Sequence, residues 1–338
     1  MYLKFYGLNE EPFRLTPDPR FVHLAETHRD VLTGMLESIL QRKGLMVVAG
    51  PAGTGKTTLL NLLLNQLSSP EFTSRFISTA FVWNPLMTRA EMLEAILEEF
   101  EVSCQSSSKP RRLMALQEKM VETTRRGGTS VLLIDEAHLL TTELLEEIRL
   151  LSNSDSYREK LLQIILCGQP ELLSAFERPE LQSLRQRVVR VGRLRSLSLA
   201  ETRAYLAQRL HAAGHQGHPI FAGAAIEQIH RKTQGIPRLI NQLCDNCLTI
   251  GVTTGAKQIA ADIVLEAFHS LGVAELSQAE TERNAEESVR RKAEATVSST
   301  LLGRAGTTPS IRLETPTTRT AMTILFEGIK PLRPASRE

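Results

Sequence analysis

The sequence has 338 residues, which is enough for one large domain or two modest ones. Its 40 lysine and arginine residues nearly balance its 38 aspartate and glutamate residues, so net charge favours neither a nucleic-acid nor an acidic partner. No apolar run approaches the ~20 residues that cross a bilayer, and the N-terminus lacks the apolar core of a signal peptide. We therefore expect a soluble cytoplasmic protein without a transmembrane segment, whose four cysteines are reduced thiols.

Residues 1–27 combine three prolines with several aromatic side chains. Proline limits regular structure, whereas aromatic side chains favour burial. We predict an irregular N-terminal arm packed on the core. A helix over Thr27–Gln41 then leads to a short apolar strand at Leu45–Ala49.

The segment after this strand fits the pattern G-x-x-x-x-G-K-[ST] and consists of Gly50, Pro51, Ala52, Gly53, Thr54, Gly55, Lys56 and Thr57. Its glycines allow a tight turn whose N–H groups point at phosphate oxygens, and the helix predicted over Thr58–Leu67 adds its positive N-terminal end. Lys56 is expected to reach the β- and γ-phosphates of ATP, and the Thr57 hydroxyl to ligate Mg²⁺. Thr58, the next residue, also belongs to the predicted nucleotide-binding set. The alternative is a glycine-rich turn with a chance lysine.

The chain then alternates between strand and helix patterns. Arg75–Trp83 has the pattern of a strand. A capping box begins a helix that runs from Thr88 to about Phe100, and an amphipathic helix over Lys109–Arg126 ends at two glycines.

The second chemical motif is an apolar strand over Ser130–Ile134 that ends in Asp135 and Glu136. Ligands of open α/β sheets bind beyond the carboxyl ends of the strands. We expect Asp135 to hold Mg²⁺ through water, and Glu136 to polarise the attacking water. The alternative is a strand followed by an acidic helix cap.

A helix over Glu143–Ser152 and a strand over Leu161–Cys167 follow. Strands that alternate with helices predict a parallel sheet with helices on both faces, here over residues 28–195. The predicted fold class is thus the α/β fold of a P-loop NTPase.

Helices without strands follow over residues 196–272, which predicts a small α-helical domain; they span Leu199–Ala213, Gly223–Thr233, Pro237–Gly251 and about Ala260–Leu271. Cys244 and Cys247 fall within the third helix, where packed core thiols are favoured over a zinc site. Residues 273–338 are charged and low in complexity, so we predict a disordered tail. Within it, Ile324–Phe326 is a candidate docking segment.

The order of these elements resembles an AAA+ ATPase with its helical lid. Further motifs resemble the general secretion pathway protein A (ExeA) family, over roughly residues 1–270; they are Phe5–Leu8, Pro17–Phe21, Glu146–Asn153, Gly168–Leu172 and Gly235–Asn241. Longer members of that family continue into a transmembrane helix and a periplasmic peptidoglycan-binding part, and we expect neither in this chain.

The resemblance also implies roles for individual residues. Gln169, after an apolar strand, matches the sensor 1 position beside the γ-phosphate. Arg238 matches the sensor 2 position, at the start of a lid helix; an ordinary surface arginine is the alternative. Asn84, after the second strand, is a candidate to hold Glu136 inactive, although Asn-Pro is also a common turn.

The resemblance places an arginine finger near Arg185 and Arg187, between Gln169 and the lid. Such a finger completes the site of a neighbouring subunit, which implies self-association. Arg190, Arg193 and Arg195 extend this basic stretch. A solvated basic face and a DNA-binding strip remain alternatives, but no aromatic residue among these arginines supports base stacking.

The favoured function is an ATP-hydrolysing, oligomeric motor for a secretion or envelope-assembly system, such as type II secretion, pilus or exopolysaccharide export. One alternative is a DNA-associated AAA+ helper of the transposition or initiator kind. A nucleotide switch that signals without turnover is another, and Glu136 argues against it.

Overall fold

The computed structural model describes residues 2–16, 18–69, 72, 76–154 and 159–271. The tail predicted over 273–338, with its segment Ile324–Phe326, lies outside the described residues. Within the described part of the chain, no helix is both long enough and apolar enough to span a membrane.

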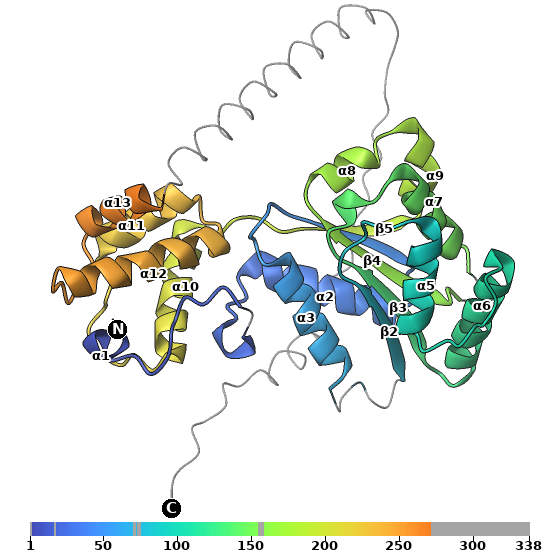
Figure 1. The fold of residues 1–338 in the computed structure, drawn as a ribbon, viewed down its shortest axis with the longest axis horizontal. Helices are drawn as coiled ribbons and strands as arrows, with labels where there is room; N and C mark the ends of the chain where they lie inside the picture. Colours follow the sequence, from blue (N-terminus) through green and yellow to red (C-terminus); the bar gives the residue numbers. More distant parts are fainter. Residues whose placement is uncertain (1, 17, 70–71, 73–75, 155–158, 272–338) are drawn as a thin grey trace, which may run out of the picture. The chain divides into compact units, whose positions relative to one another are not determined.

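The centre of the fold is a parallel sheet in the order β2-β3-β4-β1-β5 (Figure 1). Its strands are β1 (Leu45–Ala49), β2 (Ile77–Val82), β3 (Thr129–Ile134), β4 (Leu162–Gly168) and β5 (Val188–Arg193). Ala49 is in register with Gly168, and Ile134 with Leu166, so the carboxyl ends of these three central strands meet at one edge. The segments that follow those strands therefore come together in space.

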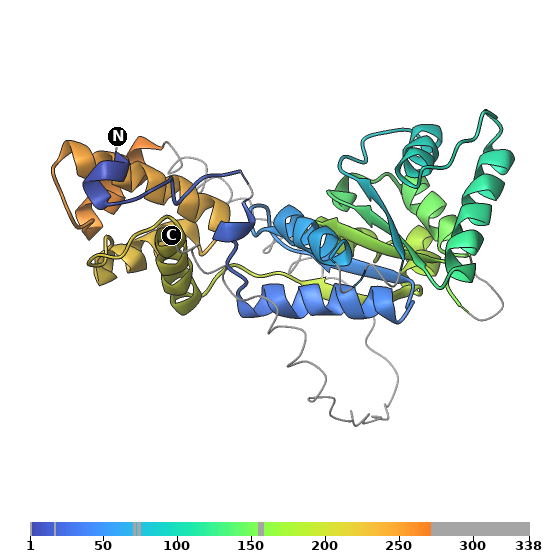
Figure 2. The ribbon, with the colours of Figure 1, turned by 90° about the horizontal axis from the view of Figure 1, so that it is seen from below.

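Helices cover both faces of the sheet, as predicted (Figures 1 and 2). Alternate residues of a strand point to opposite faces. Met46 and Val48 of β1 pack in one apolar cluster with α2 and α3, whereas Leu45 and Val47 pack in another with α5, α6 and α7. The helices are α2 (Glu26–Leu40), α3 (Lys56–Leu67), α5 (Arg89–Glu99), α6 (Lys109–Arg125) and α7 (Thr142–Leu151).

Some element boundaries follow directly from local chemistry. The hydroxyl of Thr88 accepts from the N–H of Glu91, and the Glu91 carboxylate accepts from the N–H of Thr88, so the predicted capping box begins α5.

Between β3 and β5 the chain forms short helices, namely η2 (Ala137–Leu139), α8 (Glu171–Ala175), η3 (Pro179–Leu181) and α9 (Gln182–Arg185).

The strand β5 is absent from the sequence-based prediction, which treated Arg190 and Arg193 only as part of a basic stretch. Among the described strands, β5 pairs with β1 alone and forms an edge of the sheet. An edge strand tolerates charged residues because one of its sides faces solvent. Its three valines are all at least partly exposed, with Val189 at 51%, and they alternate with arginines only in part, so the sequence signal of a buried strand is weak.

The helices after β5 pack in an apolar cluster that is separate from the two clusters of the sheet. They are α10 (Leu199–Ala212), α11 (Gly223–Thr233), α12 (Pro237–Thr253) and α13 (Ala261–Ser270), each close to its predicted range. Cys244 and Cys247 are fully buried in this cluster, and burial raises the pKa of the Cys247 thiol to about 12. Both thiols thus pack in the helical core.

The N-terminal arm differs in two ways from the predicted irregular segment on the core. It contains a helix, α1 (Tyr2–Tyr6), and a short turn of helix, η1 (Pro19–Phe21). Its buried side chains belong to the same apolar cluster as α10, α11, α12 and α13, the four helices that we call the lid. The Tyr2 hydroxyl donates to Asp245 Oδ1 at 2.5 Å, and the Tyr6 hydroxyl donates to Ala256 O at 2.9 Å. The arm therefore packs on the lid helices.

Arg209 of α10 fastens the arm to the lid from a buried position. Its guanidinium donates to Pro12 O at 2.6 Å, to Arg14 O at 3.1 Å and to the Tyr205 hydroxyl at 2.9 Å. The same group lies over the rings of Phe21 and Tyr205. One planar side chain thus satisfies two carbonyls of an irregular segment.

We expect Arg209→Met to lower the free energy of unfolding by about 3 kcal/mol, because the buried Pro12 carbonyl and the partly buried Arg14 carbonyl lose a charged donor. In a unit of this size that corresponds to a melting temperature lower by about 6–12 °C. Thermal unfolding followed by circular dichroism measures the change. Arg203→Met, at an exposed position of the same helix, is the matched control. Equal melting temperatures for both variants would contradict the role of Arg209.

Candidate functional site

The glycine-rich loop connects β1 to α3 as predicted. Gly53 has a φ of 76°, and a Cβ added there would lie 2.9 Å from Arg238 Cβ, so a side chain at this position would collide with the lid. The buried Lys56 extends back over the loop, where its Nζ donates to Gly50 O at 2.9 Å and to Pro51 O at 3.0 Å. The Lys56 ammonium and the N-terminus of α3 thus both lie next to the loop.

Thr57 meets the acidic strand end beside this loop. Its hydroxyl donates to Asp135 Oδ2 at 2.5 Å, and Asp135 Oδ1 accepts from the N–H of Glu136 at 2.8 Å. Asp135 is only 2% exposed. A hydroxyl and a carboxylate are hard oxygen donors of the kind that Mg²⁺ prefers. These two predicted metal ligands lie together and fit that ion.

Glu136 and Gln169 lie at the same edge of the sheet. Glu136 adopts a left-handed backbone conformation with a φ of 47° at the start of η2. Gln169 follows Gly168, the last residue of β4, and its Nε2 is 3.0 Å from His138 Nε2. Both Glu136 and Gln169 line the pocket described next.

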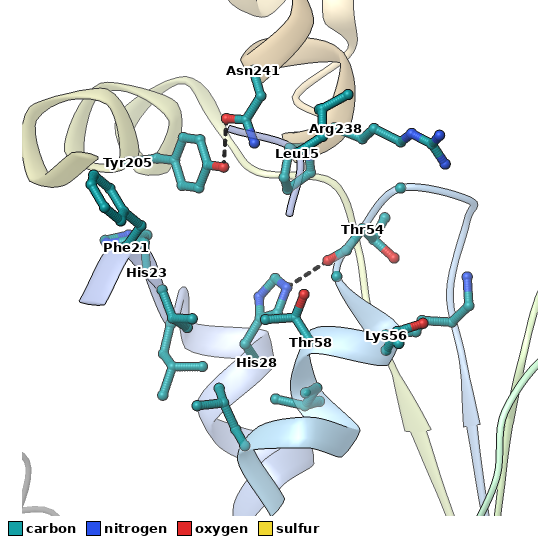
Figure 3. A pocket seen from close by; sticks show the side chains of 18 of the residues that line it. Leu15, Phe21, His23, His28, Thr54, Lys56, Thr58, Tyr205, Arg238 and Asn241 are labelled. Carbon is teal, nitrogen blue, oxygen red and sulfur yellow. Dashed lines mark hydrogen bonds between the residues drawn. The ribbon is translucent and has the colours of Figure 1, made fainter. Parts of the chain in front are cut away.

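A pocket of about 420 Å³ extends from the loop between the arm and the lid. In Figure 3, lid residues Tyr205 and Asn241 lie across the pocket from His28, Thr58 and Lys56. The Tyr205 hydroxyl donates to Asn241 Oδ1 at 2.8 Å. The residues of the loop that line the pocket run from Ala52 to Thr58. Its size suits a small-molecule ligand.

Sequence reasoning missed His28, the first buried residue of α2. Burial lowers the pKa of its imidazole, so the ring is neutral at pH 7 and Nε2–H donates to Thr54 O at 2.8 Å. This bond ties the loop to α2 (Figure 3). No motif links two residues 26 positions apart, and only the fold brings them together.

Arg238 is also part of this pocket. Its backbone N–H donates to Gly53 O at 3.2 Å, while its guanidinium is exposed at the pocket (Figure 3). The start of α12 is thereby joined directly to the loop.

Residues 39–176 match the family model of the AAA domain. With the loop, the acidic strand end and a parallel sheet in place, this match identifies the domain. The chain contains an AAA domain of the AAA+ family. It is 35% identical over 275 residues to general secretion pathway protein A of Aeromonas hydrophila. That alignment covers 81% of this chain and 49% of the relative, so the chain spans about half the length of the curated relative.

Solved structures with low sequence identity share the fold. The ORC2 protein of Aeropyrum pernix has a TM-score of 0.57 and 16% identity, over 77% of this chain and 71% of that one. Drosophila ORC, in a structure bound to DNA, has a TM-score of 0.58 and 18% identity, over 76% of this chain and 63% of that one. At these identities the likeness establishes the P-loop NTPase fold alone.

The two candidate arginine fingers do not line this pocket. Among the described residues that line the pocket, neither Arg185 nor Arg187 occurs. Arg185 ends α9, and Arg187 directly precedes β5. The pKa of the Glu146 carboxyl is lowered, chiefly by hydrogen bonds from Arg149 and in small part by the charge of Arg187. Both candidate fingers therefore lie outside the pocket of their own chain.

Two arginines of the predicted basic stretch are paired with carboxylates. Arg190 Nη1 is 2.6 Å from Glu37 Oε2, and Arg195 Nη1 is 2.7 Å from Glu201 Oε2. These ion pairs reduce the free positive charge that a DNA-binding strip would offer to phosphates. The observation weighs against the DNA-associated alternative.

Asn84 supports the turn interpretation. Its Oδ1 accepts from the N–H of Leu86 at 3.1 Å, which closes the turn after β2. The side chain is thus engaged in local backbone structure in this conformation.

Proposed function

We propose that this AAA+ protein binds ATP with Mg²⁺ and hydrolyses it to ADP and phosphate. The observation that carries the proposal is that Lys56, Thr57 and Glu136 line one pocket, and that Asp135 is hydrogen-bonded to Thr57 beside it. Phosphoryl transfer needs positioned cations and a polarised water rather than a covalent partner. These residue types supply both requirements.

Each residue has one task in the proposed reaction. The backbone of residues 50–55 and the N-terminus of α3 hold the phosphates, and Lys56 supplies a cation beside them. Thr57 and Asp135 would hold Mg²⁺, which neutralises phosphate charge when bound. Glu136 orients the attacking water. Gln169 contacts the γ-phosphate region, and Arg238 links bound nucleotide to the lid.

We further propose an oligomeric motor that serves a secretion or envelope-assembly system. The support is the 35% identity to general secretion pathway protein A, which extends over 81% of this chain. ATP supply places such a motor in the cytoplasm. Co-purification of the full chain with products of neighbouring genes, followed by mass spectrometry, tests this role. Recovery of a transposase in place of export components would contradict it.

The test of nucleotide binding is Lys56→Ala. We expect the variant to bind a fluorescent ATP analogue about 10- to 100-fold more weakly, because a hydrogen bond to a charged group contributes about 1.5–3 kcal/mol. Lys43→Ala, at an exposed position just before β1, is the control and should bind as the parent does. Equal affinity in the parent and Lys56→Ala would refute the assignment of the loop.

A further inference from the structure

His138 lies between the two pocket residues that the proposed chemistry uses. Its Nε2 is 3.0 Å from Gln169 Nε2, and its Nδ1 is 3.4 Å from Glu136 Oε2. The side chain of His138 is 13% exposed, whereas that of Glu136 is 42% exposed. One mostly buried imidazole thus faces both the acid after β3 and the amide after β4.

The hydrogen-bonding capacity of the two groups fixes the direction of these contacts. An amide nitrogen only donates, so in the neutral ring Nε2 accepts from Gln169 and the proton resides on Nδ1. That proton faces Glu136 Oε2. Both His138 Nδ1 and Glu136 Oε2 are buried, and within the described part of the chain neither makes a hydrogen bond. Leaving two buried polar atoms unpaired is costly, and each of these two atoms lies 3.4 Å from the other.

The fold holds the imidazole close to Gln169. Gly168 ends β4 against η2, and a Cβ added to Gly168 would lie 2.9 Å from the backbone nitrogen of His138. The turn of η2 is closed by the Leu139 N–H, which donates to Glu136 O at 2.9 Å. The backbone positions of Glu136, His138 and Gln169 are therefore fixed relative to one another.

We propose that His138 is a positioning residue for ATP hydrolysis, an inference that rests on the function proposed above. Its Nδ1–H holds Oε2 of Glu136, which leaves the remainder of the carboxylate directed at the water. Its Nε2 orients the amide of Gln169. One side chain thereby couples the group that senses the γ-phosphate to the group that orients the nucleophile.

The experiment compares His138→Ala, His138→Asn and His138→Gln in the full chain. Asn places an amide near the position of Nδ1, and Gln places one near Nε2. We expect His138→Ala to lower kcat by about 10- to 100-fold, because a displacement of about 1 Å in a reacting group costs up to about 100-fold. His138→Asn should recover more of kcat than His138→Gln does. KM and the affinity for an ATP analogue should stay at the parent values.

A double variant separates positioning from a general structural role. Because the ring acts partly through the carboxylate, adding His138→Ala to Glu136→Gln should lower the single-turnover rate by a smaller factor than adding it to the parent does. His218→Asn, at an exposed position, should behave as the parent, and thermal unfolding checks that every variant is folded.

Three outcomes would overturn the role of His138 while leaving the ATPase intact. The first is a parent-like kcat for His138→Ala. The second is that His138→Ala lowers the single-turnover rate by the same factor in the parent and in Glu136→Gln. The third is that kcat of His138→Asn is no higher than that of His138→Ala. A parent chain that binds ATP without turnover would instead refute the proposed ATPase, and the inference with it.

Discussion

Glu136→Gln should bind ATP as tightly as the parent chain and hydrolyse it about 100-fold more slowly, or slower still. The amide keeps the shape of the side chain but loses the charge that polarises the water. Glu136 lines the pocket and is only half withdrawn from solvent, so the substitution disturbs little packing. Phosphate release under saturating ATP and titration with a fluorescent analogue measure the two properties separately.

Glu227→Gln provides the matched control for this substitution. It makes the same chemical change at an exposed position of α11 and should leave turnover unchanged. Undiminished phosphate release by Glu136→Gln would show that another group orients the water, and the catalytic role of Glu136 would have to be abandoned.

The parts of the site that the sequence predicts are those carried by contiguous residues. The segment from Gly50 to Thr57 has its strand before it and its helix after it, and the pair Asp135 and Glu136 directly follows an apolar strand. Parallel strands end at a common edge, so sequence order alone brings these segments together. The contact of 2.5 Å between Thr57 and Asp135 agrees with this argument.

The parts that the sequence does not predict depend on contacts between distant segments. Nothing local distinguishes His28 from other histidines, and its bond to Thr54 forms only because the fold brings α2 next to the loop. The aromatic residues of the arm predict that it is buried against another part of the chain, but the sequence does not indicate which part. In the structure the lid helices bury them.

Charge patterns were the least informative part of the sequence. Arg190 and Arg195 looked like members of an exposed basic stretch, whereas each has a carboxylate partner in the structure. Glu37 and Glu201, the partners, are far away in the sequence or belong to a helix cap, and no periodicity connects them with the arginines. The run of arginines therefore predicts free positive charge, whereas in the structure two of these arginines form ion pairs with carboxylates.

Arg187→Ala should bind ATP normally and hydrolyse it about 1000-fold more slowly, because arginine fingers contribute at least that factor in phosphoryl transfer. Arg187 does not line the pocket of its own chain, so its guanidinium would have to act on the site of a neighbouring copy. Arg185 is the second candidate, and Arg178→Ala, an exposed arginine just before η3, is the matched control.

Mixing two inactive variants tests whether the site is shared between subunits. A Lys56→Ala chain cannot hold the phosphates but retains Arg187, which it can offer to the intact loop of an Arg187→Ala neighbour. The mixture should therefore recover part of the activity that both variants lack alone. In the parent, turnover per chain should rise with protein concentration as subunits associate. Constant turnover per chain down to a demonstrated monomer, without recovery in the mixture, would mean that each chain hydrolyses ATP alone and that Arg187 has another task.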